Sequence, residues 1–280
     1  MNHTELYNRT SLQCAKLVTN RYSTSFSLGI KMLGREIRGP IYAIYAFVRL
    51  ADEIVDTFHD HDKEVLLREF REETDKALER KISVNPVLHA FQRAVHAHGI
   101  ERELIDAFLD SMEMDLSGRT YDDSLYRKYI YGSAEVVGLM CLHVFCGGDR
   151  ELYGRLKAPA GSLGAAFQKV NFLRDLKDDF GDRGRMYFPQ VDFERFDPAD
   201  KRGIEADIRL DFADALEGIR QLPPSSCKGV YLAYRYYVKL FRKISGKRPE
   251  QIKSGRIRIS NASKMYILMK SFARYQLNIF

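Results

Sequence analysis

The sequence contains two stretches in which acidic residues recur four positions apart within apolar surroundings. Four residues of the first stretch have side chains that could bind a metal ion or a phosphate group, and on a helix they would lie within about 60° of one another. They are Tyr45, Arg49, Asp52 and Asp56. Most residues between them are apolar, so we expect this helix to be buried. Two buried carboxylates one turn apart are costly to desolvate unless a cation neutralises them. Magnesium prefers oxygen ligands and accepts substrate phosphates as further ligands, so the first stretch suits a metal–phosphate site.

A solvated acidic face is the alternative interpretation of this first stretch. Glu53 and the acidic residues that follow Asp56 would extend such a face. A single pair of aspartates four positions apart is only a weak indication of metal binding. The first stretch by itself therefore leaves both interpretations open.

The second stretch places further oxygen ligands on another expected helix. Its ligand-type residues share one helical face; they are Gln168, Asn171, Asp175 and Asp179. One amide oxygen and two carboxylates would suit a magnesium ion that keeps several waters. Arg174 and Arg185 add guanidinium groups that suit bidentate phosphate contacts, and Tyr187 adds a phenolic donor. If the two stretches face each other, they enclose a cavity that clamps a diphosphate and helps it to leave.

The elements that must position these residues are predicted to be helices, because apolar residues recur three and four positions apart along most of the chain. Strand-like alternation is scarce. No linker or repeat divides the sequence, so we predict one all-α domain over residues 1–280. The predicted helices cover residues 12–18, 40–58, 63–80, 86–98, 102–116, 125–145, 159–179, 204–222 and 226–244.

Composition narrows the class of protein further. The chain of 280 residues is 45% hydrophobic and carries a net charge of +6, which suits anionic partners or simply a soluble basic surface. Its 4 cysteines form no CxxC pair. The polar start has no signal-peptide pattern, and no apolar run approaches the ~18 residues that span a bilayer. We therefore expect a cytoplasmic protein with reduced thiols.

In the order and spacing of its motifs the chain resembles the squalene/phytoene synthase family, over about residues 14–270. A late Arg258-Ile-Ser260 is similar to the ends of bacterial phytoene synthases. The other matching segments are Ser23–Phe26, Tyr45–Arg49, Asp52–Asp56, Met112–Asp115, Tyr129–Gly138, Leu163–Gln168, Asn171–Asp175 and Arg185–Pro189.

The resemblance implies an isoprenoid-synthase helical bundle around a central cavity. Two prenyl diphosphates would condense there head to head through a cyclopropylcarbinyl diphosphate. The implied ligands of magnesium, or of manganese in its place, are Asp52, Asp56, Asn171, Asp175 and Asp179. The implied catalytic residues are Asp52, Asp56, Asp175, Asp179, Tyr45 and Arg49. The implied substrate contacts are Ser23, Phe26, Tyr45, Arg49, Tyr129, Gln168, Arg174, Arg185, Tyr187, Tyr236 and Arg258.

We expect phytoene as the product, made from two geranylgeranyl diphosphates without NADPH. The alternative is a squalene, dehydrosqualene or hydroxysqualene synthase that acts on farnesyl diphosphate. Reductive squalene formation would need NADPH, and the sequence has no glycine-rich dinucleotide fingerprint. A non-catalytic helical binding protein is the alternative from another class, and nucleic-acid binding lacks a recognisable motif.

Chain length and membrane contact give two further expectations. Ile30 would lie one helical turn after Phe26, where it could limit the length of the lipid chain. The tail over residues 264–280 mixes basic and bulky apolar side chains. We expect it to be a terminal helix packed on the core, and the alternative is peripheral docking at the inner face of the membrane. The oligomeric state stays open.

Overall fold

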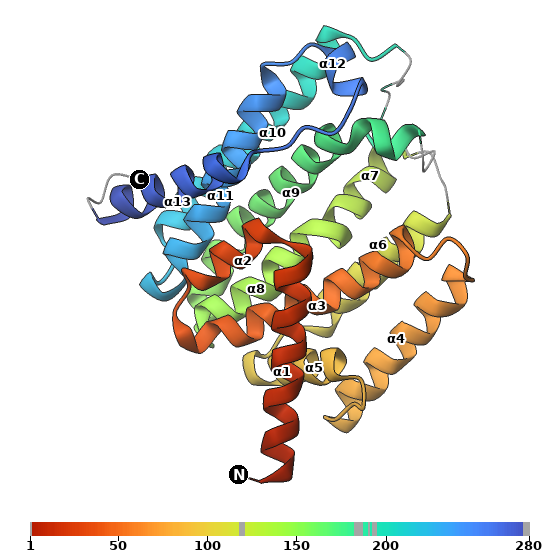
Figure 1. Ribbon diagram of the computed structural model, residues 1–280, viewed down its shortest axis with the longest axis vertical. Coiled ribbons are helices and arrows are strands. Elements are labelled where there is room, and N and C mark those ends of the chain that lie inside the picture. The colour runs from red at the N-terminus through yellow and green to blue at the C-terminus, as the bar shows by residue number, and fades with distance from the viewer. Residues whose placement is uncertain (1, 118–120, 182–186, 190, 192–194, 277–280) are drawn as a thin grey trace.

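The computed structural model describes residues 2–117, 121–181, 187–189, 191 and 195–276. The described residues form helices and no strands, so the prediction of an all-α fold is confirmed. In Figure 1, α4 and α5 lie in the lower part of the view and α10 and α12 in the upper part. The elements are α1 (His3–Tyr22), α2 (Thr24–Lys31), α3 (Arg35–Asp56), α4 (Lys63–Arg80), α5 (Pro86–His98), α6 (Arg102–Leu116), α7 (Asp123–Ile130), the π-helical η1 (Tyr131–Glu135), α8 (Val136–Cys146), α9 (Arg150–Gly181), α10 (Pro198–Arg220), α11 (Pro224–Ser245), α12 (Pro249–Lys253) and α13 (Asn261–Gln276).

Local signals explain why α4 and α5 have the predicted bounds. The Asp62 side chain caps α4 by accepting a hydrogen bond from the Val65 amide at 3.0 Å. Asn85 caps α5 in the same way, Pro86 occupies its first turn, and Gly99 ends it with a φ of 63°. Capping side chains accept hydrogen bonds from the first amides of a helix, and a glycine in the left-handed region lets the chain turn away at its end. These short-range devices are readable in sequence.

The segment α7–η1–α8 is one continuous helical rod that packs tightly against α6 and α9. A Cβ atom on Gly164 of α9 would lie 2.6 Å from the Ala134 carbonyl oxygen, so only glycine permits this crossing. The rod (Asp123–Cys146) is long and apolar enough to cross a membrane by length and composition, because it contains an 18-residue window with a mean hydropathy of 1.4. This corrects the expectation that no apolar run could span a bilayer. However, 56% of that window is buried inside the fold, as in the core helix of a bundle.

Aromatic packing on α3 organises the lower part of the core. Phe47 is fully buried, and its ring stacks on that of Phe91 with centroids 3.8 Å apart. Phe70 and Phe108 pack against Phe47 from α4 and α6, each at 5.5 Å. A second buried cluster joins α9, α10 and α11. Because α3 belongs to the first cluster and α9 to the second, the fold fixes both stretches identified from sequence.

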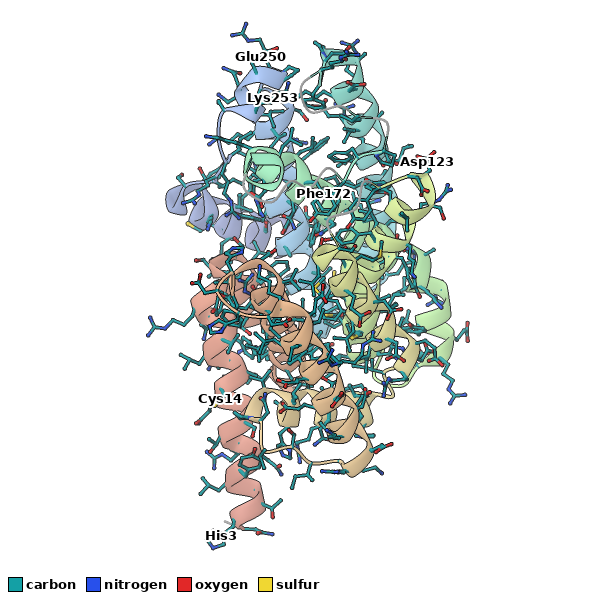
Figure 2. All side chains as sticks on the ribbon, turned by 90° about the vertical axis from the view of Figure 1, so that its right-hand side faces the viewer. His3, Cys14, Asp123, Phe172, Glu250 and Lys253 are labelled. Carbon is teal, nitrogen blue, oxygen red and sulfur yellow. The ribbon has the colours of Figure 1, made fainter. Side chains whose placement is uncertain are left out.

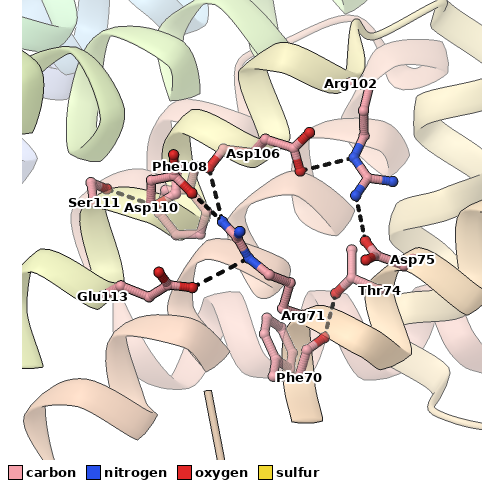
Figure 3. A network of polar contacts seen from close by, with 10 residues as sticks. All are labelled: Phe70, Arg71, Thr74, Asp75, Arg102, Asp106, Phe108, Asp110, Ser111 and Glu113. Atoms are coloured by element: carbon pink, nitrogen blue, oxygen red, sulfur yellow. Dashed lines mark hydrogen bonds and ion pairs between the residues drawn. The ribbon is translucent and has the colours of Figure 1, made fainter. Parts of the chain in front are cut away.

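Ion pairs reinforce the contact between α4 and α6 (Figure 3). Arg71 of α4 pairs with Asp110 and lies 3.5 Å from Glu113. Arg102 of α6 is 2.5 Å from Asp75 and 2.9 Å from Asp106. These side chains are partly exposed, where each pair contributes at most about 1 kcal/mol. The network therefore supports the packing of Phe47 and its neighbours rather than replacing it.

The last helix, α13, packs on α11. Ile267 is buried, whereas Tyr266 and Met269 are 63% and 67% exposed. The ammonium group of Lys264 lies 5.7 Å from the ring centroid of Tyr236, which belongs to α11. The packed terminal helix expected from sequence is present in the described residues.

Replacing the central aromatic should destabilise the whole fold. We predict that Phe47→Ala lowers the free energy of unfolding by about 3–5 kcal/mol, because it leaves a cavity among three other rings. Urea denaturation followed by circular dichroism measures this. The matched control is Phe58→Ala, at a position that is 37% exposed, for which we expect less than about 1 kcal/mol. Equal losses in the two variants would contradict this account of the core.

Candidate active site

A cavity of about 670 Å³ lies between the two core clusters, and both acidic stretches line it. Phe172 of α9, labelled near the middle of the molecule in Figure 2, belongs to its wall. From α3 come Tyr45, Arg49, Asp52 and Asp56, and from α9 come Gln168, Asn171, Arg174 and Asp175. Two segments far apart in sequence thus contribute carboxylates, amides and guanidinium groups to a single cavity.

The Asp52 carboxyl on the α3 wall lies in an unfavourable environment for a negative charge. Burial raises the pKa of Asp52 to about 7. The Arg49 guanidinium opposes this rise, whereas the carboxylates of Asp56 and Asp115 add to it. Removing water from an acid and surrounding it with like charge both favour the neutral form. The α3 wall therefore carries more negative charge than its own cation neutralises.

On the α9 wall, Asp175 is clamped by two arginines. Arg174 donates from Nε and Nη2 to the two carboxylate oxygens at 2.9 and 2.5 Å. Arg256, from the segment after α12, forms an ion pair with Asp175, with 2.9 Å between its Nε atom and the carboxylate oxygen Oδ1. Such paired guanidinium groups also suit diphosphate oxygens. The cavity therefore has its basic groups directly beside a carboxylate.

The late basic residue that lines the cavity is Arg256 rather than Arg258. Arg258 is exposed and is not part of the cavity wall, and its carbonyl accepts a hydrogen bond from Lys243 at 2.7 Å. In the non-helical segment 256–260, Ile257 and Ile259 are buried and anchor the chain. The anchored segment brings Arg256 to Asp175 and carries the next arginine away from it. The motif at residues 258–260 was identified from the sequence, but the sequence did not show which arginine contacts Asp175.

Asn171 and Gln168 lie on the cavity wall, where Tyr237, a residue that was not identified from the sequence, contacts Asn171. The Tyr237 hydroxyl donates to the Asn171 amide oxygen at 3.2 Å, and the Asn171 amide nitrogen lies 3.4 Å from the Gln168 oxygen. Tyr237 also stacks on Phe167, with ring centroids 3.8 Å apart. Its neighbour Tyr236, named from the resemblance, lines the cavity as well. The helical period of α11 would have been the signal for Tyr237.

A second unassigned residue is Asp115, which organises the tyrosines near the acidic groups. It is only 8% exposed and accepts hydrogen bonds from Tyr129 at 2.7 Å and Tyr187 at 3.0 Å. The Tyr187 ring stacks on Phe172 at 4.1 Å. Burial raises the pKa of Tyr129 well above its usual value, and the Asp115 charge adds to this. Tyr129 is thus a protonated donor, and both tyrosines are held in place by Asp115. The motif Met112–Asp115 was the available signal for Asp115.

The remaining named residues fall into two groups. Ser23 caps α2 by accepting from the Phe26 amide at 3.1 Å, and the rings of Phe26 and Tyr45 lie 5.6 Å apart on the wall. Burial raises the pKa of Tyr45 to about 12, against a hydrogen bond with Ser23. Asp179 belongs to α9, but its side chain lies outside the described part of the structure. Arg185 lies outside the described residues altogether.

The rest of the cavity is lined by aliphatic and small side chains. Ile30, buried at 4% exposure, lines it together with Val137, Gly138 and Cys141. A Cβ atom on Gly138 would lie 2.9 Å from the Ala160 carbonyl oxygen, so helix packing alone accounts for this glycine. Polar groups at one part of the wall and small or aliphatic groups elsewhere are the pattern of a site for an amphiphilic ligand.

The donor set of this cavity fits a hard divalent cation. Among the side chains that the structure describes, no three His, Cys, Asp or Glu are placed closely enough to hold a metal ion. However, Asp52, Asp56, Asn171 and Asp175 present oxygen donors to one cavity. The raised pKa of Asp52 shows that its negative charge lacks compensation there. Oxygen-rich, under-neutralised walls suit magnesium, which keeps waters and substrate oxygens in its shell.

The fold and sequence can be compared with known proteins at this point. A crystal structure of a dehydrosqualene synthase superposes with a TM-score of 0.81 at 21% identity, covering 96% of this chain and 98% of that one. A presqualene diphosphate synthase of Rhodopseudomonas palustris is 26% identical over 88% of this chain and 92% of its own. A 15-cis-phytoene synthase of a Paracoccus species is 28% identical over 88% of this chain and 86% of its own.

The fold is therefore that of the dehydrosqualene synthase structure, an all-helical bundle around a cavity. The squalene/phytoene synthase family matches residues 19–263, and the chain belongs to this family. Its class of reaction is the head-to-head condensation of prenyl diphosphates, carried out by a prenyltransferase. The resemblance identified from the motifs is confirmed.

The raised pKa of Asp52 should make the stability of the metal-free protein depend on pH. The folded pKa of about 7 exceeds the usual value of an unfolded aspartate, so the charged group lowers stability as pH rises between those values. We predict that Asp52→Asn raises the free energy of unfolding relative to wild type more at about pH 8 than at about pH 5.

Urea unfolding in the presence of a chelator measures this difference. Asp60→Asn, at an exposed position, is the matched control. A stabilisation by Asp52→Asn that is equal at both pH values would contradict the predicted environment of Asp52.

Proposed function

We propose that this protein is a magnesium-dependent phytoene synthase, which joins two geranylgeranyl diphosphates and releases diphosphate. The observation that supports it most is the convergence of the α3 and α9 stretches on one cavity that is polar at one part and apolar elsewhere. A prenyl diphosphate has the same division between a charged head and a hydrocarbon chain. The relative from the Paracoccus species bears the name of this activity.

The roles of the residues follow from their chemistry. Asp52 and Asp56 on α3 and Asn171 and Asp175 on α9 would hold magnesium, which supplies positive charge to the departing diphosphate. Arg49, Arg174 and Arg256 would bind the diphosphate oxygens through guanidinium donors. We expect the ion pairs of Asp175 with its arginines to open when the substrate head group arrives. Asp179 and Arg185 would join these groups, as the family resemblance implies.

The hydrocarbon chains would lie along the apolar part of the cavity. There the rings of Phe26, Phe167 and Phe172 and the side chain of Ile30 line the wall. Ionisation of the first substrate leaves an allylic cation, which aromatic faces stabilise and which water would destroy. The double bond of the second substrate would attack this cation, and loss of a proton to the released diphosphate would close the ring of the cyclopropylcarbinyl diphosphate. The hydroxyls of Tyr129 and Tyr187 donate hydrogen bonds to Asp115.

A squalene-type synthase that uses farnesyl diphosphate is the second candidate. It is favoured by relatives named presqualene diphosphate synthase, including one from Zymomonas mobilis that is 30% identical over 75% of this chain. The head-group site would be the same in both candidates. They differ in the length of hydrocarbon that the apolar part must accept and in the fate of the cyclopropylcarbinyl diphosphate.

Product identification separates the two candidates. We expect purified protein with magnesium to convert geranylgeranyl diphosphate to phytoene without NADPH, as measured by liquid chromatography and mass spectrometry. Farnesyl diphosphate should react more slowly. A C30 product formed only from farnesyl diphosphate would overturn the choice of phytoene. No release of diphosphate from either substrate would support the non-catalytic binding protein instead.

Chain-length preference should depend on the apolar wall at Ile30. We predict that Ile30→Phe shifts the ratio of kcat/KM values toward farnesyl diphosphate by about tenfold, because one to two carbons of pocket length are worth that factor. Competition between the two substrates in one reaction measures the ratio. The control is Leu210→Phe, at a position 71% exposed on α10, which should leave the ratio unchanged. An unchanged ratio in Ile30→Phe would contradict a role in length selection.

Activity should depend on carboxylates from both walls. We predict that Asp56→Asn and Asp175→Asn each lower kcat by about 100-fold or more, because each removes an anionic ligand of the ion that stabilises the leaving group. A coupled assay for released diphosphate measures this. Excess chelator should abolish the activity of the wild type, and added magnesium should restore it. Full activity of either variant would contradict the assignment of that wall.

A further inference from the structure

Arg49 is held by groups on three sides at the α3 wall. Its Nη2 atom donates to the Glu53 carboxylate one turn later. Its Nη1 atom lies 3.9 Å from Asp52. The ring of Tyr22 faces the guanidinium group, with 4.5 Å between the guanidinium carbon and the ring centroid. A guanidinium at this distance over a tyrosine face is attracted by the ring.

One donor of Arg49 is not used by these neighbours. Its Nε atom is buried and has no hydrogen-bond partner among the described residues. A buried donor without a partner is costly, and an incoming anion would relieve that cost. Arg49 also lines the cavity, so the anion can reach the side chain. The neighbours of Arg49 therefore hold its guanidinium group in place, while its Nε donor still lacks a partner that an anion would supply.

The position of Tyr22 is set by the corner between two helices. Tyr22 is the last residue of α1, and the next residue, Ser23, caps α2. The Ser23 amide donates to the Thr19 carbonyl at 3.0 Å, which holds this corner in place. Tyr22 is the one α1 residue among the described residues that line the cavity. The rest of α1 packs on α3 and α5, so α1 reaches the site through this single ring.

We propose that Tyr22 is a positioning residue that acts through Arg49. Its ring and the Glu53 carboxylate hold the guanidinium plane, so that the guanidinium group is presented to the diphosphate of a bound substrate. Arginine otherwise loses considerable rotamer freedom when it binds an anion, and a prior constraint reduces that loss. The inference rests on the proposed function, because it takes diphosphate as the anion. It adds a determinant of affinity that none of the sequence motifs contains.

Binding of inorganic pyrophosphate with magnesium tests this inference without turnover. We expect Tyr22→Leu to weaken pyrophosphate binding by between about threefold and thirtyfold, the range of a partly desolvated cation–π contact. Tyr22→Phe keeps the ring and should bind within about twofold of wild type. Isothermal titration calorimetry measures both. An affinity of Tyr22→Phe as low as that of Tyr22→Leu would overturn the inference and assign the effect to the hydroxyl group.

A double-mutant cycle shows whether Tyr22 works through Arg49. In an Arg49→Gln background, Tyr22→Leu should cause no further loss of pyrophosphate affinity, because the guanidinium is already gone. Additive losses would overturn the inference. Tyr266→Leu is the matched control, since Tyr266 also lies under a cation, 5.7 Å from Lys270, but does not line the cavity. It should bind pyrophosphate as wild type does.

Two further measurements keep the outcomes distinct. Thermal melting checks that each variant folds, and Tyr22→Gln, which also lacks a ring, replaces Tyr22→Leu if that variant does not fold. If the wild type condenses prenyl diphosphates but Tyr22→Leu binds pyrophosphate normally, the inference fails alone. If the wild type binds pyrophosphate but condenses nothing, the proposed function fails, and the Tyr22 comparison still decides the inference.

Discussion

Burial of carboxylates in the cavity wall is the constraint on which this site depends. Packing of the aromatic core fixes α3, and glycine-mediated crossings fix α9, so neither helix can turn its acidic face away. Burial raises the pKa of Asp52, and the carboxylates of Asp56 and Asp115 add to this rise. The buried carboxylates lower the stability of the fold, and the two hydrophobic cores on either side of the cavity offset this loss. Such a site gains most from a ligand that brings cations with it.

The protein compensates its negative charge unevenly. Asp175 is paired with Arg174 and Arg256, whereas the ion pair of Asp52 among the described residues is a 3.9 Å contact with Arg49. Arginine is always charged, so the α9 pairs persist over the physiological pH range. This asymmetry makes the α9 wall the more stable half of the site in the metal-free protein. The α3 wall depends more strongly on what binds.

The helices and the chemical class were predictable from sequence because they depend on local patterns. Caps at Asp62 and Asn85 mark helix starts, and the two acidic stretches carry their helical spacing in the sequence itself. Contacts between distant segments were not predictable in this way. Arg256 reaches Asp175 through the path of a non-helical segment, and Tyr22 meets Arg49 only because α1 ends at that corner. Residues missed from sequence are those whose role depends on tertiary packing.

The continuous rod of α7, η1 and α8 has a consequence for biosynthesis. It contains an 18-residue window that is apolar enough to resemble a membrane span, yet α9, which packs along η1 and α8, lies later in the chain. During translation this rod therefore leaves the ribosome after α3 and α6 but before its partner α9. Until α9 packs against Ala134 and Gly138, the nascent chain exposes the hydrophobic surface that α9 covers in the finished fold. The order of helices along the chain thus leaves part of the hydrophobic surface of this rod exposed during synthesis, and this surface is buried in the finished fold.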